Sequence, residues 1–404
     1  MPFLQFLRTV LVGTILLLLS VAGFNLVIDP YGLYGFAIDG VNVRKPQSRT
    51  HILLGKQQRL IRAQPDTVIL GNSRADLGLD PESPYWPKDF GTVFNFAIPG
   101  EAMYGTVRRY DFARHHVPVR QFILPLDLMD FLIKKAADPA TGFPLPNQPG
   151  LFSFQSLMET LLSKAALLDS ILTILRQRDP FAVDVTPLGF NPAKDFIPVI
   201  RLEGHHTVET QKLYANFDNF LRLAPDLLRT DGTEAEPLQW LRILLDDARE
   251  QNFGITILFY PVHANLLDVY DVTGRWTALE ELKRIVVEIV SEQQAKNPAW
   301  RAAVWDFADY SEYAAEPFPL RDDRTAQMQW YWESGHFKAA LGDLMLQRMY
   351  GNGPDGFGAL LTSSNIDTVL SDIRQRKEAY REAFPQNFEM LRVLCQQKQC
   401  KPSP

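Results

Sequence analysis

Cysteine is scarce in this sequence. Of 404 residues only Cys395 and Cys400 carry a thiol, and both lie within the last ten positions. The four residues between them do not form a CxxC motif, and no second pair is present to complete a zinc site. Two interpretations of this pair stay open: a small terminal disulfide in an exported protein, or two exposed thiols.

An excess of positive charge is also absent, since the formal net charge is -6. This balance argues against a basic nucleic-acid-binding surface, and no nucleic-acid partner is expected. The histidine pairs at 115–116 and 205–206 are adjacent in sequence. Adjacent side chains on a helix point about 100° apart and make poor metal clips, so no metal or cofactor is predicted.

Charged residues are missing from positions 9–28, which include the leucine run 16–19. Twenty uncharged, mostly apolar residues are enough to cross a bilayer core of about 30 Å as a helix. Arg8 precedes the segment and Asp29 follows it. The positive-inside rule then leaves residues 1–8 in the cytoplasm and the rest of the chain on the other side of the membrane.

A cleaved signal peptide is the competing interpretation of this segment. Ser20, Val21 and Ala22 form a small-residue site that a signal peptidase can use. Apolar residues continue past this site as far as Ile28, which favours a retained anchor. Both interpretations place most of the chain across the membrane.

Short apolar segments alternate with helical patterns in the rest of the chain. Because parallel sheets are covered on both faces, this alternation predicts an α/β fold with a mainly parallel sheet. Function in such folds collects at the carboxyl ends of the strands. The expected strands are 67–70, 92–97, 121–126, 255–259 and 302–307, and the expected helices are 51–63, 104–116, 237–250 and 279–296.

The alternation is interrupted between residues 131 and 234. This stretch begins with a proline-rich loop at 138–149 and continues with helical patterns at 152–178 and, more weakly, at 208–228. The predicted domains are a cytoplasmic tail 1–8, a membrane helix 9–28, an α/β domain in two parts, 29–130 and 235–355, a mostly helical insertion 131–234, and a helical tail 356–404 with a charged helix at 365–384.

The G-x-S-x-G motif of α/β-hydrolases is lacking, because Ala75 occupies the place of its second glycine. The first strand is followed instead by Gly71, Asn72, Ser73 and Arg74. Glycine allows a tight turn and close approach of a substrate, and unpaired N–H groups at a helix start can stabilise an oxyanion. Ser73 is therefore a candidate nucleophile, with Asn72 and Arg74 as possible substrate-binding residues. The competing interpretation is a simple helix cap.

His336 is the candidate base. It follows Glu333 by three residues and precedes an amphipathic helical pattern at 337–349. A carboxylate on Nδ1 leaves Nε2 free to accept the proton of Ser73, which is the arrangement of a Ser-His-acid triad. His263 follows the strand 255–259 and is either a possible substrate-binding residue or an ordinary loop histidine.

Three blocks together resemble the SGNH (GDSL-like) hydrolase superfamily. The segment 68–74 resembles the nucleophile block, the segment 95–100 the second block, and the segment 333–336 the final acid-x-x-His block. The resemblance covers about residues 60–130 and 250–350. It implies a three-layer, flavodoxin-like sandwich, in which the backbone N–H groups of Ser73 and Gly100 hold the oxyanion.

The third block of that superfamily, G-x-N-D, is missing. Asp127 follows the third strand in place of the asparagine that would donate to the oxyanion. An ionised carboxylate cannot donate, so we expect a structural role for Asp127. Asn72, Asn95 and Arg74 remain as alternative donors or substrate-binding residues.

The membrane helix followed by this nucleophile block is similar to a periplasmic branch that includes alginate O-acetyltransferase-like proteins. The resemblance implies a single-pass protein of the bacterial inner membrane with its catalytic domain in the periplasm. It also implies a polysaccharide substrate and, as a possible partner, a multipass membrane protein that supplies the acyl group.

The leading hypothesis is serine-dependent O-acyl transfer, with acetyl as the expected group, to or from an extracytoplasmic polysaccharide. One alternative is a non-catalytic membrane-tethered scaffold or glycan-binding protein, which the missing G-x-N-D block supports. Another is a secreted GDSL-type esterase or lipase, which predicts a deep apolar acyl pocket and a cleaved N-terminus.

Overall fold

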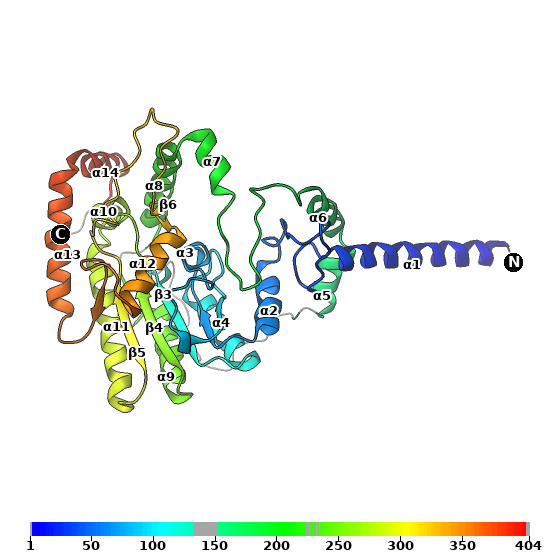
Figure 1. The fold of residues 1–404 in the computed structure, drawn as a ribbon, viewed down its shortest axis with the longest axis horizontal. Helices are drawn as coiled ribbons and strands as arrows, with labels where there is room; N and C mark the ends of the chain where they lie inside the picture. Colours follow the sequence, from blue (N-terminus) through cyan, green and yellow to red (C-terminus); the bar gives the residue numbers. More distant parts are fainter. Residues whose placement is uncertain are drawn as a thin grey trace. The chain divides into compact units, whose positions relative to one another are not determined.

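The computed structural model describes residues 2–132, 150, 152–223, 226–228, 232 and 234–400, and Figure 1 shows its ribbon. The chain divides into two compact units. Unit 1 comprises Met1–Arg62 and Pro146–Ile197, and unit 2 comprises Ala63–Leu145 and Pro198–Pro404. This division differs from the predicted one, because residues 29–62 group with the apolar helix and the expected insertion is shared between the units. The proline-rich loop expected at 138–149 lies outside the described residues.

Unit 2 is built on a sheet whose described strands have the order β2-β1-β3-β4-β5-β8. The first five pair in parallel, and β8 pairs antiparallel with β5 at the edge. The sequence therefore predicted the mainly parallel α/β sheet correctly but missed the short edge strand β8. The bounds are β1 (Thr67–Ile69), β2 (Val93–Asn95), β3 (Gln121–Leu126), β4 (Gly254–Phe259), β5 (Ala302–Asp306) and β8 (Ala359–Leu361).

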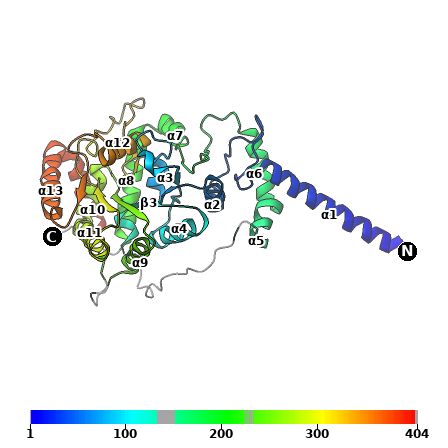
Figure 2. The ribbon, with the colours of Figure 1, turned by 60° about the horizontal axis from the view of Figure 1, so that its bottom comes forward.

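Helices cover both faces of this sheet. Figure 2 shows α4, α9 and α11 along one side and α3 and α12 on the other, and the same helices are neighbours by contact. A parallel sheet needs this double cover because its strands are apolar on both faces. The bounds are α3 (Ser73–Gly78), α4 (Met103–His116), α8 (His205–Leu221), α9 (Glu236–Glu250), α10 (Ala264–Val272), α11 (Trp276–Lys296) and α12 (Ala339–Tyr350), with α7 (Phe196–Glu203) at the boundary between the units and the 3₁₀ turns η1 (Lys88–Phe90) and η2 (Leu128–Asp130).

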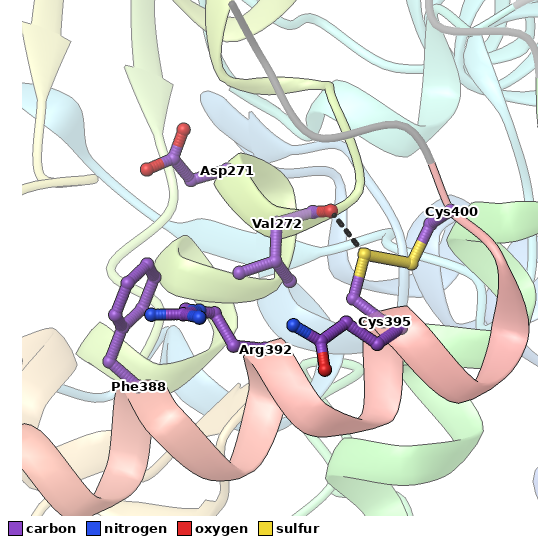
Figure 3. Close-up of a pocket in the computed structure, with 7 residues that line it drawn as sticks. Asp271, Val272, Phe388, Arg392, Cys395 and Cys400 are labelled. Carbon is purple, nitrogen blue, oxygen red and sulfur yellow. Dashed lines mark hydrogen bonds between the residues drawn. A yellow bond between two sulfur atoms is a disulfide. The ribbon is translucent and has the colours of Figure 1, made fainter.

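The C-terminal tail packs on unit 2. It forms α13 (Ile366–Ala383), which the sequence predicted, and α14 (Pro385–Lys398), which it did not. Arg381 ties α13 to α10 through two hydrogen bonds to Asp268, of 2.9 and 2.8 Å. A disulfide joins Cys395 to Cys400 beside a cavity of about 290 Å³ between α10 and α14 (Figure 3).

Among the described residues of unit 1, one helix, α1 (Pro2–Ile28), is long and apolar enough to cross a membrane. The other described helices of this unit are α2 (Ile52–Ala63), α5 (Phe154–Leu157), the π-helix η3 (Met158–Leu162) and α6 (Lys164–Leu175). The prediction of one continuous helix over 152–178 is therefore wrong, because the helix is interrupted at Ser163. Ser163 has an extended backbone and accepts a hydrogen bond from the N–H of Ala166, so it ends one helix and caps the next.

Two glycines allow α3 and the segment after His336 to approach closely. A Cβ on Gly78 would overlap the ring of Phe337, and a Cβ on Gly342 would overlap the backbone oxygen of Gly78. The carboxyl end of α3 therefore fits against the first turn of α12 only without side chains at these positions. This contact joins the helix that begins at Ser73 to the segment that carries His336.

We expect the Gly342→Ala substitution to lower the free energy of unfolding by about 1–3 kcal/mol, because the added methyl group forces two backbones apart. Urea unfolding followed by circular dichroism measures the change. The matched control is Ala340→Leu on the same helix, where Ala340 is exposed. This control is expected to shift stability by no more than about 0.5 kcal/mol. Equal stability of the two variants would contradict the close contact.

Candidate functional site

The candidate site lies at the carboxyl ends of β1, β2 and β3. Ser73 begins α3 just after β1, Gly100 follows β2, and Asp127 follows β3. The strand order reverses next to β1, and ligands of open α/β sheets bind at such a switch point. These three residues line a cavity of about 620 Å³.

A serine, a histidine and a glutamate are hydrogen-bonded in series at this cavity. Ser73 Oγ lies 2.8 Å from His336 Nε2, and His336 Nδ1 is hydrogen-bonded to Glu333 Oε1. The serine is separated from the histidine by 263 positions in the chain. The geometry matches a nucleophile, a base that takes its proton, and a carboxylate that fixes the tautomer of the base.

Glu333 is buried and charged. Burial alone would raise the pKa of its carboxyl, but the His336 ring, the Gly335 N–H and the Arg74 guanidinium together outweigh burial and hold that pKa below the ordinary value. Gly335 N–H donates to Glu333 Oε2 at 2.8 Å. Ser334 and Gly335 form the loop of a hairpin whose strands are β6 (Tyr331–Glu333) and β7 (His336–Phe337), so Glu333 and His336 lie at the two ends of this loop. The carboxylate is therefore ionised and fixed against the imidazole ring.

Arg74 is a positioning residue for this loop. Its Nε donates to the carbonyl of Gly335 at 2.7 Å, and its guanidinium forms a buried ion pair with Asp127. Asp127 also accepts a hydrogen bond from the N–H of Met129. The expectation of a structural role for Asp127 agrees with these contacts.

Asn72 caps α3 and faces the cavity. Its Oδ1 accepts from the N–H of Arg74 at 3.0 Å, and its Nδ2 donates to Asp130 at 3.2 Å. The cap expected as a competing role is therefore present, and it coexists with the serine–histidine contact. Gly71 precedes it with a φ of 110°, and a Cβ there would overlap the hydroxyl of Tyr260.

The backbone N–H groups of Ser73 and Gly100 have no hydrogen-bond acceptor within the part of the chain that the structure describes. Ser73 occupies the first position of α3, where a helix leaves its N–H unpaired. Gly100 has a φ of 77° and lines the same cavity. Both donors are therefore available to a ligand oxygen at the cavity.

Sequence reasoning missed the contribution of α8. Asn216, Asn219 and Arg222 line the cavity, the last of them just past the end of this helix. Their spacing of three residues places them along one side of a helix, which is the one signal that the sequence offered. Arg222 has no ion-pair partner among the described residues. One wall of the cavity is thus rich in amide groups and carries a positive charge.

A second buried carboxyl group, that of Glu209, lies close to Glu333. Glu209 on α8 is buried and accepts a hydrogen bond from the backbone N–H of Ser334 at 2.5 Å. Burial, with the nearby charge of Glu333, raises the pKa of Glu209 to about 8. Glu209 therefore holds its proton at neutral pH and leaves Glu333 as the single negative charge of the pair.

Two residues named from the sequence are not at the cavity. The amide of Asn95 donates to the carbonyls of Ala75 and Leu79 at 2.7 and 2.9 Å, within the core. His263 is buried, caps α10 and lies 2.7 Å from the carbonyl of Glu316. Neither residue is therefore among those that line the cavity, and for His263 the alternative of an ordinary loop histidine fits these contacts.

Within the described part of the chain, no group of three or more histidine, cysteine, aspartate or glutamate side chains is arranged to hold a metal ion. The cavity presents a hydroxyl, an imidazole ring, amides, guanidinium groups and the carboxylates of Glu101, Asp127 and Asp130. Comparisons with protein-family models, with curated proteins and with solved structures found no match to this chain.

The raised pKa of Glu209 sets the sign of a pH effect on stability. The folded state holds this proton more tightly than the unfolded chain does. The stabilisation is full below the ordinary value of 4.5 and is lost as the pH rises to about 8. The slope is on the order of 1 kcal/mol per pH unit.

We therefore expect Glu209→Gln, which cannot ionise, to gain stability relative to the wild type as the pH is raised from 5 to about 8. Denaturant unfolding at several pH values measures this difference. The exposed Glu312, replaced in the same way, controls for loss of a surface carboxylate. A difference between Glu209→Gln and wild type that does not change with pH would contradict the assignment.

Proposed function

We propose that this chain is a serine-dependent O-acyl transfer enzyme with Ser73 as nucleophile, His336 as general base and Glu333 as the carboxylate that orients it. The observation that carries the proposal is the 2.8 Å contact between Ser73 Oγ and His336 Nε2, with Glu333 on the opposite ring nitrogen. Such a contact allows the proton to leave the serine as its oxygen attacks. The resemblance to the SGNH superfamily rests on the same residues.

In the first half of the reaction, Ser73 Oγ bonds to the carbonyl carbon of an acyl ester while its proton passes to His336. The carbonyl oxygen becomes an oxyanion, and the free N–H groups of Ser73 and Gly100 are the proposed donors. The bond to the leaving alcohol then breaks, and His336 returns the proton to that alcohol. The product is an ester of Ser73.

In the second half, a hydroxyl group gives its proton to His336 and attacks the ester of Ser73. The bond to the serine breaks, and Ser73 regains its proton from His336. If the hydroxyl belongs to a sugar, the reaction is a transfer, and if it belongs to water, the reaction is a hydrolysis. The asparagine absent from the third SGNH block is not required in this scheme, because two backbone donors are present.

The lining of the cavity favours a polar acceptor over a lipid. Asn216, Asn219 and Arg222 on one side and Asn72 and Asp130 on the other provide donors and acceptors for hydroxyl groups. A lipase would instead need a deep apolar pocket for a long acyl chain. We therefore propose a short acyl group and a glycan acceptor, with the α/β unit on the far side of the membrane that α1 crosses.

A non-catalytic scaffold is the second candidate, and the substitution of Asp127 for the expected asparagine favours it. Against it stand the hydrogen-bonded triad and the unpaired N–H groups at the same cavity. A chain that only binds glycan has no need of a buried carboxylate on its histidine. The two candidates differ in whether Ser73 becomes acylated.

We expect Ser73→Ala to lower the rate of p-nitrophenyl acetate hydrolysis by at least about 10³-fold, because the nucleophile is removed. The assay uses the full chain in detergent micelles, and mass spectrometry of the wild type looks for an acetyl group on Ser73. The control is Ser291→Ala, which changes an exposed serine on α11. Equal rates for wild type and Ser73→Ala on folded samples would remove the catalytic assignment and leave the scaffold.

We further expect soluble oligosaccharides to increase the turnover of the wild type and to become acetylated themselves, because the cavity offers hydrogen-bonding groups for hydroxyls. Release of p-nitrophenol and the mass of the oligosaccharide measure the two effects. Turnover that depends on Ser73 but is unchanged by any oligosaccharide would point to an esterase rather than a transferase.

A further inference from the structure

Helix α6 of unit 1 has an inverted pattern of burial. Its fully buried positions are Ala166, Ser170 and Thr173, which are small or polar. Its exposed positions are apolar after the first turn: Leu168 49%, Ile171 42%, Leu172 42%, Ile174 36% and Leu175 72%. A helix on the surface of a water-soluble domain shows the opposite arrangement, with its apolar side buried.

The buried side of α6 is hydrogen-bonded to the end of α1 through Ser170. Ser170 Oγ donates to Asn25 Oδ1 at 2.8 Å, and Asn25 Nδ2 donates to the carbonyl of Leu161 at 2.8 Å. Next to Ser170, Asp169 accepts a hydrogen bond from the hydroxyl of Tyr31, just past the end of α1, at 2.8 Å. The buried polar groups thus fix α6 and η3 to the last turns of α1, and the leucine-rich side is left facing outward.

The depth at which α6 would lie in a bilayer follows from the depth of α1. The uncharged stretch of α1 runs from Thr9 to Ile28, and twenty residues span about 30 Å, which is the thickness of a bilayer core. A bilayer that covers this stretch also covers the last turn of α1, where Asn25 is hydrogen-bonded to Ser170 of α6 and to Leu161 of η3. The exposed leucines of α6 therefore lie at the level of the acyl chains.

The length and charges of α6 argue against a second complete span. Twelve residues extend about 18 Å, which is little more than half of the core. Lys164 at its start and Arg178 just beyond its end are exposed, and exposed Glu159 on η3 is hydrogen-bonded to Gln155. These three charged residues lie outside the stretch 168–175, where headgroups and water can solvate them. Asp169 lies within that stretch, is half-buried and accepts the hydrogen bond from Tyr31.

We propose that the apolar side of α6 inserts into the acyl chains of the leaflet in which α1 ends, so that two helices rather than one hold unit 1 in the bilayer. The partner is a lipid bilayer, and the binding surface consists of Leu168, Ile171, Leu172, Ile174 and Leu175. The inference rests on α1 crossing a membrane and does not depend on the proposed chemistry at Ser73.

The test uses the full chain reconstituted in phosphatidylcholine–phosphatidylglycerol vesicles, with a cysteine introduced at one position and labelled with an environment-sensitive fluorophore. Leu175→Cys reports on α6, and Leu17→Cys on α1 is the reference within the membrane. Leu320→Cys is the matched control, because Leu320 is 79% exposed in unit 2, close to the 72% of Leu175. Unsubstituted protein carried through the same labelling reports any reaction of Cys395 and Cys400.

We expect the probe at Leu175 to show blue-shifted emission and to lose as much fluorescence to doxyl-labelled lipid as the probe at Leu17, while the probe at Leu320 is quenched only by aqueous iodide. A probe at Leu175 that behaves like the one at Leu320 would overturn the proposal. A probe at Leu175 shielded from both lipid and iodide would also overturn it, because protein and not lipid would then cover α6.

Discussion

The packing of α3 against β7 and the first turn of α12 governs the candidate site. Ser73 and His336 are far apart in the chain, and the contact between them depends on α3 lying against the segment that leads into α12. Glycines at 78 and 342 make room for this packing, and Arg74 adds a direct hydrogen bond to the carbonyl of Gly335. Backbone packing therefore sets the distance between Ser73 and His336.

Only one of the two buried carboxyl groups behind His336, that of Glu333, is charged. Glu333 is the ionised carboxylate, and its negative charge is balanced by hydrogen bonds and by nearby Arg74. Glu209 is hydrogen-bonded to Ser334 next to Glu333, and its pKa is raised first by burial and then by the charge of Glu333, so it keeps its proton at neutral pH. The Arg74–Asp127 ion pair occupies the strand end where the SGNH pattern has an asparagine.

The sequence was most informative where one local pattern decides the structure. The strand at 121–126 was predicted with the bounds that β3 has, and the residues Ser73, Glu333 and His336 were found from short motifs. It was least informative where distant segments meet. Nothing local indicates that Glu209 packs behind Glu333, and the polar groups of Asn95 and His263 are used by nearby backbone instead of a ligand.

The apolar segments of unit 1 show the same limit of prediction from sequence. Composition alone predicted a membrane helix at residues 9–28, and α1 is long and apolar enough to cross a membrane. The outward-facing apolar side of α6 could be identified only from which of its side chains are buried. A sequence pattern of leucine, serine and threonine cannot show which side faces inward.

The central claim is that Ser73 is a nucleophile activated by His336, and covalent labelling with a fluorophosphonate tests it most directly. The account predicts one adduct, located on Ser73 by peptide mass spectrometry, which is lost in His336→Ala but kept when the exposed His116 is replaced by alanine. A folded wild-type chain that is not labelled on Ser73, or is labelled there equally well without His336, would contradict it.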